Sequence, residues 1–377
     1  MQEQFKNIFN QAAVIIDPGS SQVKAGFSGD EHPVLVFDSF IGHAKYSKLL
    51  GGGENEVVGP QPHLRGLYKL TRPIERGVFQ TDGDLKLVLA KIFSEMNITD
   101  SKQMPVFVTE TPFTPTNKKT SIARVLFETY YSPQIFFGTQ AVLSLYATGR
   151  TDGLVFESGD GVTQVVPIYG GNKIDHASEK INLAGSEVSM NLKSQLQKLG
   201  IVVSHCNPHI LFDSMKQELV EVSPKPIDPK KPEEEHLEPA SFELPDGTEI
   251  EVRIERFLAG EVLFDPLSAG HEVKGVHEII DRSLRKLDTD LRRNLYKNIC
   301  LSGGNTMLNG FAERLATELS PFVNDNTPML NAPMTDRAQM AWQGASILSG
   351  LSNFSKMWIS KKELDEQGDR IFSIKSV

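Results

Sequence analysis

The sequence predicts an α/β fold built from two related halves. The first observation is a short apolar segment that ends in an acidic residue, Val14–Asp17, and returns through the small-residue turn Pro18–Ser21. The second is the recurrence of this order at Gly153–Glu157, which is followed by the turn Ser158–Gly161. The third is the length of 377 residues, which is long for a single hydrophobic core. Together these observations favour two α/β halves over one extended sheet.

Composition indicates the class of protein and the cellular compartment in which we expect it. Hydrophobic residues make up 39% and charged residues 23% of the chain, as is typical of a soluble globular protein. We expect no membrane span, because no apolar run reaches about 18 residues, and no signal peptide, because Met1–Gln11 is polar. Two cysteines, Cys206 and Cys300, cannot build a disulfide framework, so we expect a reducing cytosolic or nuclear compartment. The net charge of −9, without a long basic run, argues against direct binding of nucleic acid.

Apolar spacing and turn residues predict the remaining elements in chain order. In the first half we expect a strand at Val23–Phe27, a helix over Leu85–Met96, a strand at Val106–Val108, and helices over Lys118–Tyr130 and Gln140–Ala147. In the second half we expect strands at Val162–Tyr169 and Asn298–Ser302, a hairpin turn at Asp246-Gly247, and helices over Val276–Leu287, Leu291–Tyr296 and Leu308–Leu315. Gly51–Gly53 and the proline-rich Pro224–Pro239 are typical of surface loops, and Ala341–Leu351 is an apolar C-terminal stretch.

The two turns carry residue types that bind phosphate. Glycine and serine offer backbone N–H groups and hydroxyls without a bulky side chain in the way. The candidates are Gly19, Ser20, Ser21, Ser158, Gly159, Gly161 and Thr163. Asp17 and Glu157 occupy matching positions and could face each other across a hydrated Mg²⁺, while Lys24 could reach a phosphate. Each turn alone is more typical of an ordinary hairpin, and only the matched acids favour phosphate binding; neither turn follows the P-loop pattern.

A third segment, Leu301–Thr306, places two glycines between a strand and a helix, so that a purine or ribose could lie against bare backbone. An ordinary β–α turn would have the same local sequence.

At this point the chain resembles a known family. Ile16–Ser20, Ser158–Thr163 and Leu301–Gly304 resemble, in this order, the phosphate and adenosine motifs of the actin, sugar-kinase and heat-shock-chaperone ATPases. Longer strings decide for actin: Lys24–Phe27, Gln140–Arg150, Val166–Tyr169, Leu244–Gly247 and Met357–Lys362. The similarity spans nearly the whole chain, which is therefore identified as a member of the actin family. Thr148, Asp290–Arg293 and Lys361–Glu363 lean toward centractin, the actin-related protein of the dynactin filament.

The resemblance implies a fold of two lobes, each with a five-stranded type of sheet and helices, and a nucleotide cleft between them. Residues 1–147 and 340–377 would form the first lobe, with a small subdomain at about 39–72. Residues 148–339 would form the second lobe, with a small subdomain at about 184–271.

The resemblance also assigns roles to single residues. On the phosphate side it implies Asp17, Gly19, Ser20, Ser21, Lys24, Ser158, Gly159, Asp160, Gly161 and Val162. On the nucleoside side it implies Gly185, Lys216, Gln217, Gly303, Gly304 and Asn305, and Asp160 would also reach the ribose. Gln140 matches the glutamine that helps to place the attacking water, and Asp17 and Glu157 would hold Mg²⁺ or Ca²⁺ through water. The implied cofactor is ATP or ADP with this cation.

Departures from the family pattern concern hydrolysis. Pro18 replaces an asparagine, Glu157 replaces an aspartate near the cation, and Gln164 replaces the histidine that helps to order the attacking water. Glutamine cannot titrate near neutral pH, and a longer carboxylate would displace the hydrated cation. Other positions also differ: Gln217, Asp213, Ala338 and Arg76 stand where actin has a glutamate, a basic residue, a lysine and the methylated histidine. We therefore expect nucleotide binding with slow or lost hydrolysis, at most a weak Mg-dependent ATPase.

Two functions from different classes remain. The first is a cytoskeletal filament subunit, in which the loop Ala44–Glu56 would insert into a groove formed by Tyr146, Leu348, Leu351 and Met357 of the next subunit. Pro266–Val273, less apolar than in actin, would favour short filaments or a fixed assembly. The second is a non-polymerising actin-related subunit of a dynactin-like, ciliary or chromatin complex. A sugar kinase is a more distant alternative. We expect actin-family partners in a cytoplasmic, cytoskeletal location, or in the nucleus or cilium.

Overall fold

The computed structural model describes residues 12–45, 55–60, 66–201, 208–227, 238–244, 246–323, 330–331 and 336–376. The predictions for Met1–Gln11, Gly51–Gly53 and Cys206, most of the loop Ala44–Glu56 and the centre of Pro224–Pro239 lie outside the described residues. The chain divides into two compact units. Unit 1 contains residues 1–152, 168–173 and 338–377, and unit 2 contains residues 153–167 and 174–337.

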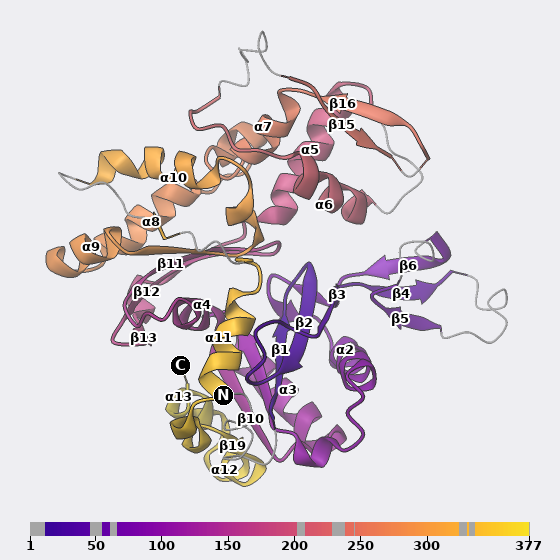
Figure 1. The fold of residues 1–377 in the computed structure, drawn as a ribbon, viewed down its shortest axis with the longest axis vertical. Coiled ribbons are helices and arrows are strands. Elements are labelled where there is room, and N and C mark those ends of the chain that lie inside the picture. Colours follow the sequence, from indigo (N-terminus) through magenta and orange to yellow (C-terminus); the bar gives the residue numbers. More distant parts are fainter. Residues whose placement is uncertain are drawn as a thin grey trace. The chain divides into compact units, whose positions relative to one another are not determined.

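Unit 1 is built on a six-stranded sheet in the order β19-β10-β9-β1-β2-β3. The central strands β1, β9 and β10 run parallel, and β2, β3 and β19 are antiparallel to their neighbours (Figure 1). The strands are β1 (Val14–Pro18), β2 (Gln22–Phe27), β3 (Leu35–Asp38), β9 (Val106–Glu110), β10 (Gln134–Thr139) and β19 (Ile359–Ser360).

Helices cover both faces of this sheet because successive side chains of each strand point to opposite sides. Ile16 and Val108 belong to one buried cluster with α2 (Asp82–Glu95) and α3 (Thr116–Arg124). Ile15 and Phe107 belong to another with α4 (Gln140–Ala147) and α11 (Met340–Ser349). The helices α12 (Lys361–Gln367) and α13 (Ile371–Ile374) complete the unit.

The helices α4 and α11 approach each other closely. A Cβ atom at Gly344 would lie 1.8 Å from the carbonyl oxygen of Leu143, so only glycine allows this contact. The contact fixes α4, whose first residue is Gln140, against the sheet.

A small sheet and a short hairpin extend unit 1. The small sheet has the order β5-β4-β6, and the hairpin joins β7 to β8. These strands are β4 (Ile41–Ala44), β5 (Glu56–Val58), β6 (Tyr68–Thr71), β7 (Ile74–Glu75) and β8 (Val78–Phe79).

Unit 2 is built on a second six-stranded sheet in the order β13-β12-β11-β17-β18, with β14 paired to β12. The tip of the β12–β13 hairpin, residues 168–173, is grouped with unit 1. The strands are β11 (Gly153–Ser158), β12 (Thr163–Tyr169), β13 (Asn172–Lys173), β14 (Glu179–Ile181), β17 (Ile299–Ser302) and β18 (Leu330–Asn331). A separate hairpin joins β15 (Ala240–Glu243) to β16 (Glu249–Val252).

One continuous apolar cluster unites the helices of unit 2 with its sheet. The helices are α5 (Gly185–Lys198), α6 (Pro208–Leu219), α7 (Glu255–Glu261), α8 (Val276–Arg285), α9 (Thr289–Tyr296) and α10 (Phe311–Leu319). None of the helices in the described ranges is both long and apolar enough to cross a membrane.

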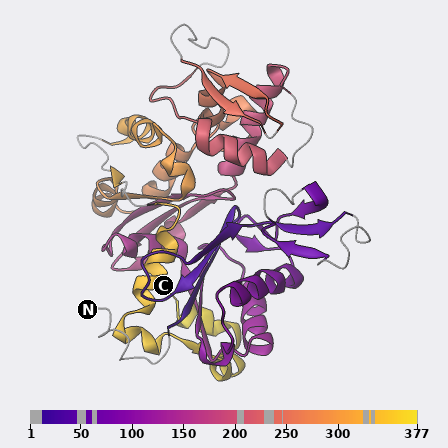
Figure 2. The same ribbon diagram turned by 45° about the vertical axis from the view of Figure 1, so that its right-hand side comes forward.

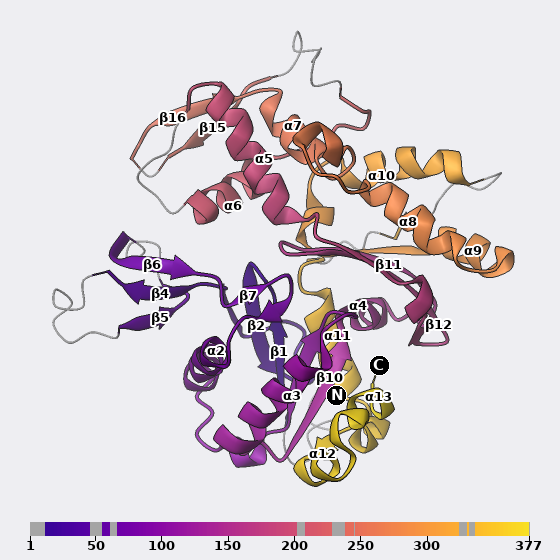
Figure 3. The same ribbon diagram turned by 180° about the vertical axis from the view of Figure 1, so that it is seen from behind.

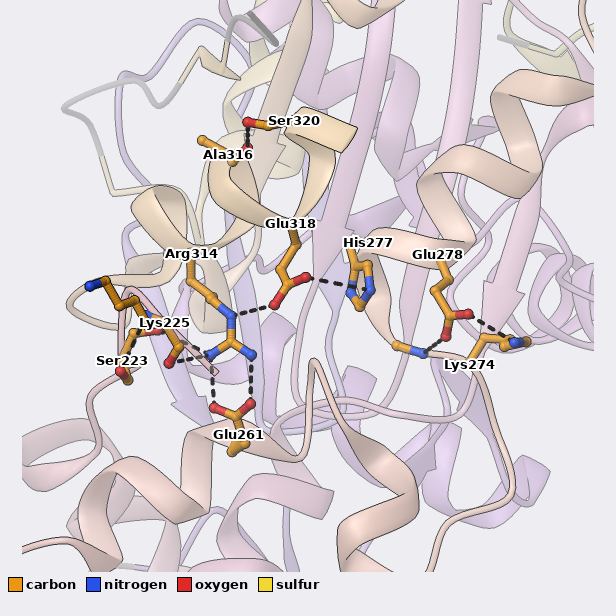
Figure 4. Close-up of polar contacts among 11 residues, drawn as sticks. Ser223, Lys225, Glu261, Lys274, His277, Glu278, Arg314, Ala316, Glu318 and Ser320 are labelled. Atoms are coloured by element: carbon orange, nitrogen blue, oxygen red, sulfur yellow. Dashed lines mark hydrogen bonds and ion pairs between the residues drawn. The ribbon is translucent and has the colours of Figure 1, made fainter. Parts of the chain in front are cut away.

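A buried ion-pair cluster around Arg314 ties α7 and α10 together (Figure 4). The Arg314 guanidinium donates to both carboxylate oxygens of Glu261, at 2.8 and 2.5 Å, and to Glu318 at 2.8 Å. It also donates to the main-chain carbonyls of Ser223 and Lys225, at 3.1 and 3.2 Å. Arg314 is 1% exposed, so this cluster replaces the water that the charge would otherwise require.

Most of the predicted elements are confirmed, with differences that have local causes. The predicted helix over Leu308–Leu315 begins at Phe311, because Gly310 adopts φ 79° and separates it from a 3₁₀ turn. The predicted helix over Lys118–Tyr130 begins at Thr116 and widens into a π-helix at Val125–Thr129. Each main sheet has six strands rather than five.

Candidate functional site

The first turn, Asp17–Ser21, begins with a buried carboxylate that three side chains hold. The parallel pairing of β1 with β9 places Asp17 beside Thr109, whose hydroxyl donates to Asp17 Oδ1. Gln140 Nε2 donates to the same oxygen at 2.9 Å, and Lys24 Nζ donates to Oδ2 at 3.3 Å. The Gly19 N–H donates to the Asp17 carbonyl at 3.1 Å. With most of its acceptor sites used, this carboxylate suits a cation bound through water rather than directly.

The rest of the first turn is linked to two neighbouring segments of unit 1. Ser20 Oγ accepts the N–H of Gly77 at 3.1 Å, and the Ser20 carbonyl accepts from Arg72 at 3.4 Å. The Ser21 carbonyl accepts the N–H of Ser39 at 2.7 Å. A change at Ser20 would therefore reach the end of β6, through Arg72, and the β7–β8 turn, through Gly77.

The second turn, Glu157–Thr163, is closed by hydroxyl and amide contacts within unit 2. Thr163 Oγ1 donates to the carbonyl of Leu183 at 2.6 Å, so Ser158 is the donor in the 2.7 Å contact between the two hydroxyls. Asn305 Nδ2 donates to Ser158 Oγ at 3.0 Å and to the Gly159 carbonyl at 2.7 Å. Because the Ser158 hydrogen is engaged, donation to a phosphate by this hydroxyl requires its rotation.

Glu157 and Gln164 form a pair across the strands β11 and β12. Gln164 Nε2 donates to Glu157 Oε2 at 2.7 Å, and Gln164 is 1% exposed. Gln164 Oε1 is buried and accepts no hydrogen bond from any described residue. An unmet buried acceptor costs about 1–3 kcal/mol, so this atom suits a bound water or another donor.

Lys216 and Gly185 meet at the beginning of α5. Lys216 Nζ donates to the Gly185 carbonyl at 3.1 Å and lies 3.4 Å from both Asp160 Oδ1 and Asp213 Oδ1. A Cβ atom at Gly185 would lie 2.9 Å from Lys216 Nζ and from Asn305 Oδ1. The glycine therefore lets the Lys216 ammonium and the Asn305 side chain lie close to the start of α5.

The other predicted residues of unit 2 lie around these contacts. Gly303 adopts φ 86°, and a Cβ atom there would meet the Ser158 carbonyl at 2.3 Å, whereas a Cβ atom at Gly304 would meet no atom within 4 Å. Val162 is 9% exposed, and Gln217 is exposed on α6. Gly161 lies between Asp160 and Val162 in the turn.

No group of three or more histidine, cysteine or acidic side chains within the described ranges is arranged to hold a metal ion. Asp17 and Glu157 offer carboxylate oxygens, which are the ligand atoms that Mg²⁺ uses in proteins, usually together with several waters. The donor set present thus fits hydrated Mg²⁺.

The predicted site residues form two groups. Asp17, Gly19, Ser20, Ser21, Lys24 and Gln140 belong to unit 1, and the remaining predicted site residues belong to unit 2. The predicted pairing of Asp17 with Glu157 across one cation stays a prediction. Sequence reasoning missed Thr109, although a polar residue at the carboxyl end of a buried parallel strand is a usable signal.

Comparisons with known proteins match the parts of the chain that contain both groups of predicted site residues. The sequence model of the family described as Actin matches residues 9–214 and 204–376 of the chain. A protein of Neurospora crassa described as an actin-like protein is 39% identical over 379 residues, which cover 96% of this chain and 97% of that protein. The matched ranges include both turns and the segment Gly303–Asn305.

Proposed function

The chain belongs to the actin family, and we propose that it holds ATP with Mg²⁺ as a structural ligand, turns it over slowly or not at all, and assembles with actin-family subunits into a filament or short filament. The predicted family and its two-lobed α/β fold are confirmed by the match. Proteins of this family generally bind a nucleotide and a divalent cation, which is the premise for the residue roles that follow.

One observation carries the proposal, namely the pair of Glu157 and Gln164. The Gln164 amide donates to the Glu157 carboxylate and keeps one buried acceptor for water. An amide can orient a water molecule but cannot take its proton near neutral pH, and the longer glutamate shifts whatever cation it holds through water. The pair therefore favours retention of a nucleotide over its hydrolysis.

The proposed ligand contacts follow the two groups of residues. Lys24 and the backbone of Gly19–Ser21 would contact phosphates, as would the backbone of Ser158–Val162. Lys216, Gln217, Gly185 and Gly303–Asn305 would contact the nucleoside, with Asp160 on the ribose. Asp17 and Glu157 would hold Mg²⁺ or Ca²⁺ through water, and the cation would offset phosphate charge. Gln140 would help to place water.

An apolar patch on unit 1 supports the assembly part of the proposal. Leu351 and Ile347 are 54% and 50% exposed, and Leu348 and Met357 are partly buried against the cluster that contains Trp342. Exposed apolar side chains gathered in one place favour contact with another protein. The alternative is a non-polymerising actin-related subunit in a dynactin-like, ciliary or chromatin complex. Either function places the chain in the cytoplasm with the cytoskeleton, or in the nucleus or cilium.

Nucleotide content is the first test. The full chain is purified gently in Mg²⁺ buffer and extracted with acid, and the released nucleotide is measured by chromatography. We expect one equivalent of ATP or ADP per chain, reduced in Lys216→Ala and unchanged in the exposed control Lys198→Ala. Nucleotide-free wild-type protein that also binds no added ATP would contradict the proposal.

Hydrolysis is the second test. Steady-state phosphate release by the wild-type chain should be slower than by conventional actin under the same conditions. Reverting the pair with Glu157→Asp and Gln164→His should raise the rate by about a hundredfold if placement of the cation and water is limiting. The single substitutions serve as controls. A wild-type rate equal to that of actin excludes the structural-ligand interpretation.

Assembly is the third test. Negative-stain imaging and pelleting with Mg·ATP and salt should show filaments or short filaments, which are lost in Leu351→Asp. Wild-type chain that stays monomeric where actin polymerises supports the non-polymerising alternative.

A further inference from the structure

An open groove in unit 1 lies between the edge strand β5 and the helix α2. The two elements lie side by side in all three views (Figure 1, Figure 2, Figure 3). The volume of the groove is 1160 Å³. Glu56 and Val57 line it from the strand, and Leu87, Ala90, Lys91 and Glu95 line it from the helix.

The strand wall of the groove offers main-chain hydrogen bonds. β5 is an edge strand that pairs with β4, with Val57 opposite Gly42. The carbonyl of Asn55 and the N–H of Gly59 point toward β4, where they bond to Ala44 and Phe40. Because main-chain groups alternate along an antiparallel strand, those of Glu56 and Val58 point away from β4, and no described residue bonds to them.

The helix wall of the groove is one continuous face of α2. Leu87, Ala90 and Lys91 follow the spacing of three and four residues that aligns side chains along a helix. Ala90 is exposed and Leu87 is half-buried, so the middle of this wall is small and apolar. An added strand would lie about 4.8 Å from β5, and the short Ala90 side chain obstructs this position less than a longer side chain would.

The rims of the groove are acidic. The Glu56 and Glu95 side chains are 47% and 46% exposed, one on each wall. Lys91 Nζ already pairs with Glu95 at 2.6 Å and lies 5.2 Å from the centre of the Phe37 ring, and only 20% of its side chain is exposed. His43 Nδ1 lies 3.2 Å from Glu56 Oε1 and offsets its charge only when protonated. The charge that the groove presents to a ligand is therefore negative.

We propose that this groove binds an extended peptide segment of a partner protein, which adds to β5 as a further strand and carries apolar residues flanked by lysine or arginine. Strand addition beside a helix supplies affinity through the main chain and specificity through alternate side chains. Because β5 has only three residues, the contact is short. It suits a linear segment rather than a second folded copy, since stable interfaces between folded proteins bury about 1,200–2,000 Å².

The test uses the full chain and a fluorescein-labelled probe with the sequence Gly-Arg-Val-Arg-Val-Arg-Gly, followed by fluorescence anisotropy. A second probe has N-methyl groups on alternate amides, which removes strand donors and keeps the charge. We expect the first probe to bind at least tenfold more tightly than the second, because each missing hydrogen bond changes affinity by about threefold to tenfold.

Substitutions locate the binding to the groove. Glu56→Pro removes the outward N–H and the charge, whereas Glu56→Gln removes only the charge, so proline should weaken binding further by about threefold to tenfold. Ala90→Arg should block the groove from the helix side, and it replaces Glu56→Pro if that variant loses its thermal unfolding transition. Glu128→Gln, an exposed acid outside the groove, is the control and should leave binding unchanged.

Several outcomes overturn the proposal. Equal binding of both probes, or equal loss with Glu56→Pro and Glu56→Gln, would show that the probe binds through charge alone and not through main-chain hydrogen bonds. Absence of binding by the first probe also refutes it. Self-association that depends on concentration and is lost in Ala90→Arg would identify a second copy as the occupant instead. None of these results depends on nucleotide content, so they are separable from the proposed function.

Discussion

The clusters around Arg314 and Lys216, both in unit 2, each bury a cation beside two carboxylates, and they hold it differently. Arg314 makes five hydrogen bonds of 2.5–3.2 Å, and its ring contact with Phe264 is 4.7 Å. Lys216 makes three contacts of 3.1–3.4 Å. The first cation is saturated by the protein, whereas the second is held loosely by groups that another ligand could share.

This difference indicates that Arg314 stabilises the fold, whereas Lys216 is available to bind a ligand. A guanidinium with every nitrogen engaged cannot give up a contact without leaving Glu261 buried and unpaired. The three donors of Lys216 make only long contacts, so one of them can turn to a ligand group, and Gly185 lets the ammonium lie close to the start of α5. Substitutions in the two clusters should therefore separate stability from nucleotide affinity.

The largest effect is expected for Arg314→Leu. Removal of the cation leaves the Glu261 carboxylate buried without a partner, which should lower the free energy of unfolding by about 3–5 kcal/mol. Urea unfolding followed by circular dichroism measures this loss. The exposed Arg285, paired with Asp281, gives the matched control Arg285→Leu, which should unfold as the wild type does. Equal unfolding of Arg314→Leu and wild type would refute the structural role of this cluster.

Lys216→Ala should mainly affect the ligand. Loss of a charge-assisted contact of about 1.5–3 kcal/mol predicts a nucleotide affinity reduced by about tenfold to a hundredfold. The free energy of unfolding of the nucleotide-free protein should fall by less than in Arg314→Leu, because the contacts of Lys216 are longer and Asp213 keeps the Ser189 hydroxyl as a donor at 2.6 Å. Displacement of a fluorescent ATP analogue measures the affinity, with Lys198→Ala as the control. A large drop in the free energy of unfolding with unchanged nucleotide affinity would show that Lys216 stabilises the fold and does not bind the nucleotide.

Acidification should lower the free energy of unfolding, because it protonates His277, which lies beside Glu318 of the Arg314 cluster. Burial is the main cause that lowers the pKa of the His277 imidazole, and the charge of Arg314 lowers it further. The Glu318, Glu278 and Glu261 carboxylates raise this pKa but do not cancel the effect of burial. Since the folded protein takes up the proton less readily than the unfolded chain, stability falls as the pH drops below 6.5. One proton limits this change to about tenfold in the unfolding constant per pH unit.

The measurement for His277 is urea unfolding between about pH 7.5 and pH 5.5, a window that spans the ordinary pKa of histidine. His277→Gln should flatten the pH dependence relative to wild type, and the exposed His32→Gln should leave it as it is. Identical slopes for wild type and His277→Gln would exclude this histidine as a source of the pH dependence.

The smallest effect is expected for Gly185→Ala. The new Cβ atom would lie 2.9 Å from Lys216 Nζ and Asn305 Oδ1 and 3.2 Å from the Asp160 Cα, so the end of the lysine must shift while the fold is kept. The displaced ammonium should lower nucleotide affinity by about twofold to fivefold, equivalent to a fraction of one hydrogen bond. Titration of the nucleotide-free variant measures this change, and an unchanged affinity would show that the space at Gly185 is not used.

The sequence by itself determined the two-part α/β plan, the family and the main residues of the two turns. Local patterns carry this information, because a buried strand, an acid and a small-residue turn are continuous in sequence. The roles of Gln140 and Gln164 were predicted from short strings in the same way, and they stay predictions. The sequence did not predict α5 or α6, although Gly185 and Lys216 lie on them, because their apolar residues are interrupted by polar ones.

The tertiary structure alone decided which residues share a contact. Thr109 reaches Asp17 through parallel pairing, Asn305 reaches Ser158 from the 3₁₀ turn after β17, and Arg314 on α10 contacts Glu261 on α7. Such partners are 92, 147 and 53 residues apart. Long-range packing brings them together, and the strength of each contact depends on burial and distance that no local pattern encodes. The same reason explains why the loose Lys216 and the saturated Arg314 could be distinguished only in the folded chain.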